Sequence, residues 1–96
     1  MRMLFMIYDA DFDDDVMEML AGCSVTGYTK WGRVLGKGKN SEPRMDDPVW
    51  PGCNCALAVV IEDELTEEIE KAAKELSSKL GGGGFAMFGL PVDRLI

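Results

Sequence analysis

One stretch of the chain combines glycine with lysine in a way that could bind an anion. It alternates the two residue types in the order Gly36, Lys37, Gly38, Lys39. Glycines let backbone N–H groups approach a ligand closely, and the two ammonium groups add positive charge beside them. The stretch does not fit a triphosphate-binding loop, because three residues rather than four separate Gly32 from Gly36, and Asn40 follows the second lysine. We expect an anion site here, and the alternative is a basic loop that keeps this segment solvated.

A second unusual stretch consists of four consecutive glycines: Gly81, Gly82, Gly83 and Gly84. One glycine is enough to end a helix, and each further one costs conformational entropy on folding. The run therefore predicts that something approaches the backbone at this place. A flexible connection is the alternative.

Cys53 and Cys55 are separated by one residue, so that both thiols would face the same side of a strand. Such a pair could bind a soft metal if Cys23 or another subunit supplied further ligands. It falls short of the four ligands of a structural zinc site, and a buried thiol pair is the alternative. Three cysteines make no disulfide framework, so we expect a reducing compartment.

Histidine is absent from the chain. Its absence excludes Ser-His and Cys-His catalytic pairs, phosphohistidine transfer and His-ligated zinc within this chain. The aspartates at 13–15 have no spacing that matches a calcium loop, and their attraction to a helix N-terminus explains them. We therefore expect a protein that is not an enzyme.

The charge of the chain is unevenly distributed. Ten Lys and Arg residues against seventeen Asp and Glu residues give a net charge of −7. Residues 26–45 hold five basic residues and one acidic residue, a local charge of +4, and the rest of the chain carries −11. The acidic total argues against nucleic acid or an anionic membrane as a partner. The basic segment is where a small anionic ligand is expected.

The length of 96 residues fits a single domain, which we place at 1–96. A chain of this size buries about two-thirds of its unfolded surface, so we expect oligomerisation to add burial. The apolar run Met3–Tyr8 is followed at once by aspartates and lacks a small-residue cleavage site, which predicts a strand and not a signal peptide. No apolar run approaches the roughly 20 residues that span a bilayer, and we expect a cytoplasmic protein without membrane insertion.

Hydrophobic periodicity predicts four strands and two helices in the order βαββαβ. The predicted strands cover residues 3–8, 25–35, 55–61 and 85–88, and the predicted helices cover 12–22 and 62–80. The first and third strands are apolar throughout, which predicts burial on both faces, and Gly32 predicts a bulge in the second. The order is that of an α+β ferredoxin-like sandwich, with two helices on one face of an antiparallel sheet.

Residues 36–54 form the longest segment without a periodic pattern. Prolines at 43, 48 and 51 interrupt it, and its glycines are at 36, 38 and 52. Loops of this length inside a small domain are functional or disordered. This segment is the one we expect to carry the function.

In the order of its elements and in three short motifs, the chain resembles the P-II signal-transduction family and its P-II-like relatives. The motifs are the runs Phe12–Leu20 and Val25–Thr29 and the Gly-x-Gly at 36–38. The resemblance implies a homotrimer, a partner-contacting T-loop at 37–54 and a glycine turn called the B-loop at 81–84. It also implies that an adenine nucleotide lies between neighbouring subunits. The implied contacts are Thr29, Gly36, Lys37, Gly38, Gly82, Gly83 and Gly84.

The chain departs from the family pattern at several positions. The B-loop lysine is replaced by glycine or Phe85, the C-terminal arginines are reduced to Arg94, and the loop has no tyrosine. We therefore expect a divergent P-II-like regulator that binds a small anionic effector, such as an adenine nucleotide or bicarbonate. Its long loop would signal to a membrane transporter or a regulated enzyme. The alternatives are a metal-responsive trimeric protein that uses Cys53 and Cys55, and a structural trimer without a ligand.

Overall fold

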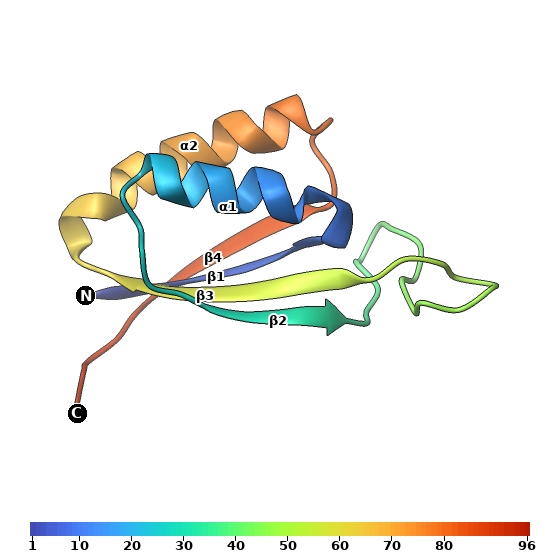
Figure 1. The fold of residues 1–96 in the computed structure, drawn as a ribbon, viewed down its shortest axis with the longest axis horizontal. Helices are drawn as coiled ribbons and strands as arrows, with labels where there is room; N and C mark the ends of the chain where they lie inside the picture. The colour runs from blue at the N-terminus through green and yellow to red at the C-terminus, as the bar shows by residue number, and fades with distance from the viewer.

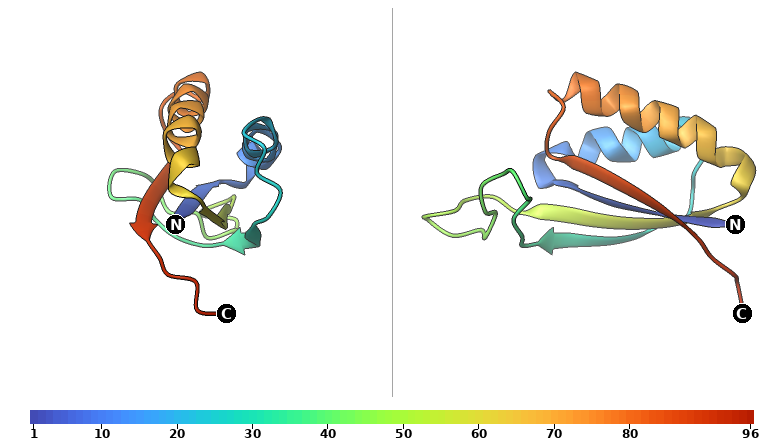
Figure 2. Two further views of the ribbon diagram at one scale, coloured as in Figure 1. Left: turned by 90° about the vertical axis from the view of Figure 1, so that its left-hand side faces the viewer. Right: turned by 180° about the vertical axis from the view of Figure 1, so that it is seen from behind.

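The structure, a computed structural model, describes residues 1–96 and consists of one antiparallel sheet with two helices on one face (Figures 1 and 2). Its four strands stand in the order β2-β3-β1-β4. The ferredoxin-like α+β fold predicted from the sequence is confirmed. In chain order the elements are β1 (Arg2–Asp9), α1 (Asp13–Gly22), β2 (Thr29–Val34), β3 (Asn54–Ile61), α2 (Thr66–Lys79) and β4 (Phe85–Pro91).

Both helices begin after a 3-10 turn, at Ala10–Phe12 and at Asp63–Leu65. The first turn is capped by Asp9, whose carboxylate accepts a hydrogen bond of 2.9 Å from the Asp11 N–H. The predicted helix at 12–22 is confirmed to within one residue. The second helix begins at Thr66, later than the predicted 62, because residues 63–65 wind as the 3-10 turn.

The core lies between the sheet and the helices. Side chains of a strand alternate between its faces, so every second residue of β1 and β3 points at the helices. The largest fully buried side chains are Tyr8, Met6, Leu20, Leu57, Ile69, Val16 and Val59. This face and the two helices supply the hydrophobic stabilisation of the single chain.

The face of the sheet opposite the helices is apolar but is not covered in the single chain. Met3, Phe5 and Ile7 on β1 are half-buried there. On the neighbouring strands Val60 is 51% exposed and Phe88 is 58% exposed. The prediction that the first and third strands are buried on both faces is therefore correct for one face of the single chain and wrong for the other.

Two strands differ in length from the prediction. β2 covers Thr29–Val34 instead of 25–35, and its pairing with β3 shifts register between Trp31 and Val34, which confirms the bulge expected at Gly32. β4 extends to Pro91 instead of ending at 88, since it pairs with β1 along nearly its whole length. No helix has the length and apolar character that crossing a membrane requires.

The long loop projects beyond one end of the sheet (Figure 1). At its base Gly36 and Arg44 form an isolated β-bridge, with N···O distances of 3.0 and 2.7 Å. At its tip the Met45 N–H donates to the Trp50 carbonyl at 3.1 Å. The predicted boundary at 54 is wrong by one residue, because Asn54 already pairs with Asp9 as part of β3.

Candidate functional site

A cleft of about 580 Å³ lies at the end of the sheet from which the loop projects. Its walls are the base of the loop at 36–38 and the glycine turn at 82–84, and Tyr8, Asn54 and Phe85 contribute to its lining. The fold creates this cleft because the end of β2 and the start of β4 lie at the same end of the sheet. The loop base and the glycine turn, which are far apart in the sequence, therefore form one site.

The four glycines divide into two pairs with different roles. The Gly81 N–H donates to Ser78 O at 3.2 Å and the Gly82 N–H donates to Ser77 O at 2.8 Å, which is the hydrogen-bond pattern of a Schellman helix end. The N–H groups of Gly83 and Gly84 have no hydrogen-bond partner, and both residues line the cleft. Two adjacent free N–H groups at a concave surface can bind an anion.

The backbone conformation and surroundings of Gly84 disfavour a side chain at the end of the turn. Its φ is +73°, and an added Cβ would lie 3.0 Å from Cε2 of Phe12. A side chain here would be strained and crowded. The glycine run predicted that another group lies close to the backbone here. Phe12, which packs against Gly84, is one such group.

At the base of the loop the N–H groups of Gly36 and Gly38 are already occupied. The first donates to Arg44 O at 3.0 Å and the second donates to Ser41 Oγ at 3.0 Å. The backbone N–H of Lys37 between them has no partner, and its ammonium group lies 3.2 Å from Gly38 O. The glycines thus shape the loop base, and Lys37 supplies the available N–H and the charge.

The +4 charge of residues 26–45 is mostly neutralised by ion pairs. Lys30 pairs with Asp13 at 2.9 Å, Arg33 with Asp46 at 2.8 Å and Arg44 with Asp9 at 2.6 Å. Neither Lys37 nor Lys39 makes an ion pair, and Lys37 alone of these two lines the cleft. Of the five basic residues in the predicted basic segment, only Lys37 and Lys39 therefore lack an ion-pair partner in the structure.

Arg44 is a residue of the site that sequence reasoning missed. It lines the cleft, and its guanidinium contacts the carboxylate of Asp9. Arg44 lies in the middle of an irregular loop and Asp9 lies at the end of a strand, so no local pattern connects them. The isolated pairing of Arg44 with Gly36 brings the two together.

Thr29 and Arg94 do not reach this cleft in the single chain. Thr29 pairs with Ala58, whereas Val34 at the other end of β2 pairs with Asn54 beside the cleft. Ala58 lies four residue steps along β3 from Asn54, a distance of about 13 Å at the usual rise. Arg94 follows β4 in the tail at the opposite end of the sheet, where its Nε donates to Ile96 O at 2.6 Å.

The cysteines do not form a metal site in this structure. Cys55 is buried and donates a weak hydrogen bond of 3.6 Å to Gly32 O, and Cys53 is half-buried. Burial raises the pKa of the Cys55 thiol, which disfavours the thiolate that a metal would need. No group of three or more His, Cys, Asp or Glu side chains is arranged to hold a metal ion.

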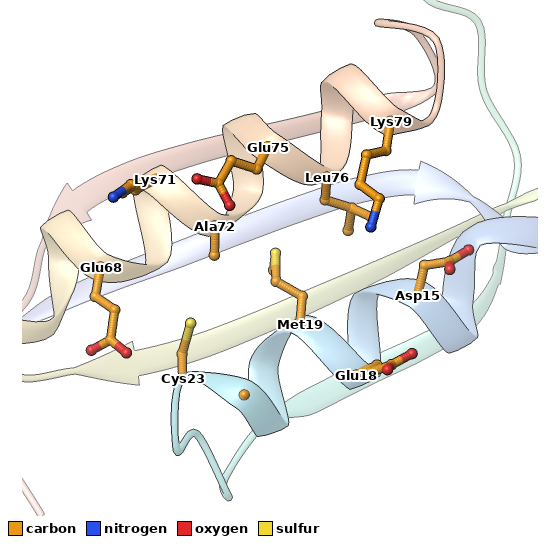
Figure 3. Close-up of a pocket in the computed structure, with 11 residues that line it drawn as sticks. Asp15, Glu18, Met19, Cys23, Glu68, Lys71, Ala72, Glu75, Leu76 and Lys79 are labelled. Carbon is orange, nitrogen blue, oxygen red and sulfur yellow. The ribbon is translucent and has the colours of Figure 1, made fainter.

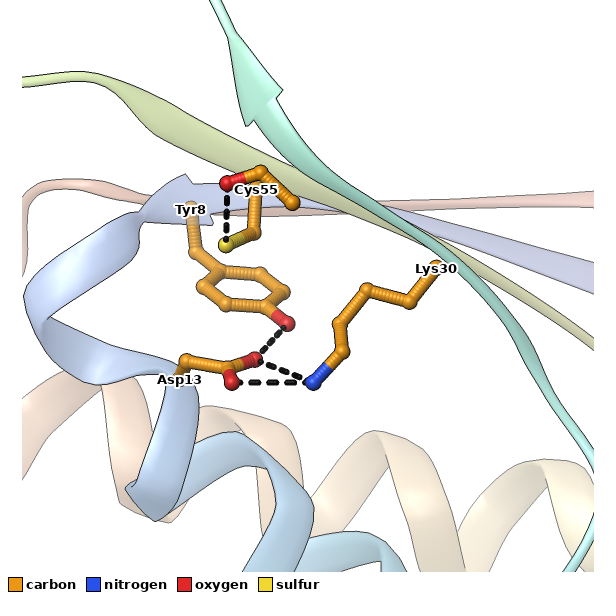
Figure 4. Close-up of polar contacts among 5 residues, drawn as sticks. Tyr8, Asp13, Lys30 and Cys55 are labelled. Carbon is orange, nitrogen blue, oxygen red and sulfur yellow. Dashed lines mark hydrogen bonds and ion pairs between the residues drawn. The ribbon is translucent and has the colours of Figure 1, made fainter.

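Beside Cys55 lies a polar cluster that fixes β2 to the start of α1 (Figure 4). The Tyr8 hydroxyl donates to Asp13 Oδ1 at 2.6 Å, and the Lys30 ammonium contacts both oxygens of the same carboxylate at 3.2 and 2.9 Å. Partial burial acts to raise the pKa of Asp13, but the hydrogen bonds from Tyr8 and Lys30 outweigh it and lower the pKa. Asp13 is therefore a charged structural link between β1, β2 and the start of α1.

A second hollow, of about 530 Å³, lies between the two helices (Figure 3). Met19 and Leu76 contribute apolar surface, and carboxylates of both helices and two ammonium groups of α2 surround it. Cys23 lines it, but neither Cys53 nor Cys55 nor any of the expected anion-binding residues does. The cleft at the loop base is therefore the candidate functional site.

Comparison with known proteins identifies solved structures of the same fold. No protein-family model and no curated protein sequence matches the chain. A structure of CPII, a nitrogen regulatory PII-like protein from Thiomonas intermedia K12, bound to ADP, AMP and bicarbonate, is 17% identical, with a TM-score of 0.71 over 97% of this chain and 88% of that one. Another CPII structure, bound to ADP and bicarbonate, has a TM-score of 0.72 at 17% identity, over 97% of this chain and 88% of that chain.

A PII-like signalling protein from Thermus thermophilus has the same arrangement of elements. It is 14% identical, with a TM-score of 0.63 over 93% of this chain and 83% of that one. The chain thus has the P-II-like fold that the sequence motifs indicated.

Proposed function

We propose that this protein is a P-II-like regulator that binds a small anionic effector in the cleft between the loop base and the glycine turn. The observation that carries the proposal is that three residues whose backbone N–H groups have no hydrogen-bond partner, Lys37, Gly83 and Gly84, line one cleft, and that the Lys37 ammonium has no ion-pair partner. Such groups complement phosphate or carboxylate oxygens. No nucleophile and base are paired in the cleft, so binding rather than catalysis is the proposed role.

The proposed effector is an adenine nucleotide, bicarbonate or both. The structures of CPII, which share this fold, contain ADP with bicarbonate, and one of them also contains AMP. The cleft has room for a ligand of nucleotide size, since pockets for small molecules usually have volumes of about 300–1,000 Å³.

We propose that the protein is a homotrimer, and the open face of the sheet supports this. Exposed apolar side chains gather on that face, and in a monomer so large an apolar surface would be unfavourable. A neighbouring subunit would also bring its own Thr29, and the tail with Arg94, toward a cleft that each chain leaves open. A particle mass three times the chain mass of 10.6 kDa in sedimentation equilibrium is the expected result.

The long loop is proposed to contact a protein partner, either a membrane transporter or a regulated enzyme. Its tip is folded, because the Asp47 carboxylate accepts hydrogen bonds from the N–H groups of Val49 and Trp50 at 3.0 and 2.6 Å. Val49 is 73% exposed there. An ordered, apolar loop tip could insert into a pocket on the partner protein. We also propose that the regulator acts in the cytoplasm.

The experiment that tests the proposal is thermal unfolding with ADP, AMP, ATP, cyclic AMP and bicarbonate, each over a concentration series. A ligand at 100 times its Kd stabilises the folded state by about 2.7 kcal/mol, which raises Tm by about 13 °C for a domain of this size. Lys37→Ala should reduce the shift, whereas Lys71→Ala, on α2 and outside the cleft, should not. A flat response to all five compounds would contradict the proposal.

A further inference from the structure

We propose that Arg44 is an exchangeable ligand-binding residue, which pairs with Asp9 in the free protein and transfers to the anion when the effector binds. This inference rests on the proposed function and adds to it a residue and a means of moving the loop. It follows from three features: the Arg44–Asp9 pair lies at the cleft, the pair is partly buried, and Arg44 holds both limbs of the loop.

The first feature is position. Arg44 lines the cleft together with Lys37, Gly83 and Gly84, the residues with free donors. Its guanidinium contacts Asp9 Oδ2 at 2.6 Å. A guanidinium has five N–H donors, so an anion seated against the glycine turn would compete with one carboxylate for the side chain of a residue that lines the same cleft.

The second feature is the environment of the pair. The Asp9 side chain is 11% exposed and the Arg44 side chain is 36% exposed. Asp9 also accepts the Asp11 N–H at 2.9 Å, so this carboxylate stays hydrogen-bonded when the guanidinium leaves. The exchange therefore replaces one charge-assisted contact by another, and the carboxylate keeps a partner.

The third feature is the connection of Arg44 to the loop. Its backbone pairs with Gly36 on the outgoing limb, with N···O distances of 2.7 and 3.0 Å. On the returning limb its guanidinium packs against Gly52, where an added Cβ would lie 2.9 Å from Nη1. A change of partner at Arg44 therefore displaces both limbs, and with them the tip. The loop conformation is coupled to the effector through this one side chain.

The test is the affinity for ADP, measured by isothermal titration calorimetry on the full chain. Arg44→Gln removes a charged donor from the bound anion and should weaken binding about tenfold. Asp9→Asn keeps an oxygen for the Asp11 N–H but removes the competing charge, and should tighten binding about tenfold. In the double variant the gain from Asp9→Asn should vanish, because no guanidinium remains to be released.

Glu42→Gln is the matched control for charge alone. Glu42 lines the same cleft and forms no ion pair, so its neutralisation should change the affinity less than about threefold, as a general effect of net charge near the anion. If Asp9→Asn tightens ADP binding equally in the presence and absence of Arg44, the exchange is refuted and the effect is that of charge. If the wild-type protein binds ADP and neither single variant changes the affinity, the inference fails while the proposed function stands.

The role of the Arg44–Asp9 pair at the loop base can also be measured without a ligand, by amide hydrogen exchange. Hydrogen exchange of the Gly36 and Arg44 amides should be faster in Asp9→Asn than in the wild type, because the pair holds the loop base. The Tm of each variant, measured by circular dichroism, establishes that it is folded. Unchanged exchange at the loop base in folded Asp9→Asn would overturn the coupling, and a wild-type protein that binds neither ADP, AMP nor bicarbonate would overturn both proposals.

Discussion

Replacement of Asp13 by Asn should destabilise the protein more than any other single aspartate-to-asparagine change in the first turn of α1. Asp13 accepts a hydrogen bond of 2.6 Å from Tyr8 and forms an ion pair of 2.9 Å with Lys30, and so joins β1, α1 and β2. Asn can still accept the Tyr8 hydroxyl, but the bond becomes neutral and the ion pair is lost. The change therefore weakens one bond and removes another.

The size of the effect follows from the two contacts. The charged character of the Tyr8 bond is worth about 1 kcal/mol, the difference between charged and neutral hydrogen bonds. The Asp13 and Lys30 side chains are 29% and 27% exposed, so their ion pair adds at most about 1 kcal/mol. A total of about 2 kcal/mol corresponds to a decrease in Tm of about 10 °C for a domain of this length.

The assay is thermal and urea unfolding of Asp13→Asn at a fixed protein concentration, because subunit association would shift the midpoint. Asp14→Asn is the matched control: it removes a carboxylate from the same helix turn, but Asp14 is exposed and has no ion-pair partner. The control should lose only the interaction with the helix dipole, about 0.3–1 kcal/mol. Equal destabilisation by both variants would refute the reasoning and assign the whole effect to the helix terminus.

Three further outcomes are expected. The pKa of Asp13 in the folded protein lies below its ordinary value of 3.8, so the contribution of Asp13 to stability is fully present above pH 3.8. That contribution is lost as the pH falls through the lowered, folded-state pKa. The difference in unfolding free energy between the wild type and Asp13→Asn should therefore shrink in urea titrations at acid pH. Gly84→Ala should cost about 1–2 kcal/mol, since φ is +73° and Phe12 is close, whereas Gly83→Ala, with open space around it, should cost less in the same unfolding assay. Phe88→Glu, at a residue that is 58% exposed on the open sheet face, should convert the proposed trimer to monomers in sedimentation velocity, and an unchanged particle mass would contradict an interface on this face.

The secondary structure could be predicted because its signals are local. The apolar spacing of 65–80 determines one face of α2, and the bulge in β2 follows from Gly32 inside a β-branched run. Two of the errors of extent have physical causes that the structure shows. The second helix begins late because residues 63–65 form a 3-10 turn, and β4 continues to Pro91 because β1 offers it a full-length partner.

The functional site could be predicted only in pieces. Glycine and lysine content identified the loop base and the glycine turn, but composition could not show that Gly83 and Gly84 keep free N–H groups while Gly36 and Gly38 do not. The ion pairs of the basic segment could not be predicted from the sequence either. Arg44 and Asp9, for example, meet only because the loop folds back on the end of the sheet, a contact between distant parts of the chain with no periodic signature.

The proposed function depends above all on the binding of an adenine nucleotide in the cleft between the loop base and the glycine turn. Titration of ADP into uniformly 15N-labelled protein, followed by two-dimensional amide NMR, tests it most directly. We predict that the largest shifts occur at Lys37, Gly83 and Gly84, whose N–H groups are free in the cleft. Absence of shifts at saturating ADP, or shifts confined to the groove between α1 and α2, would contradict it.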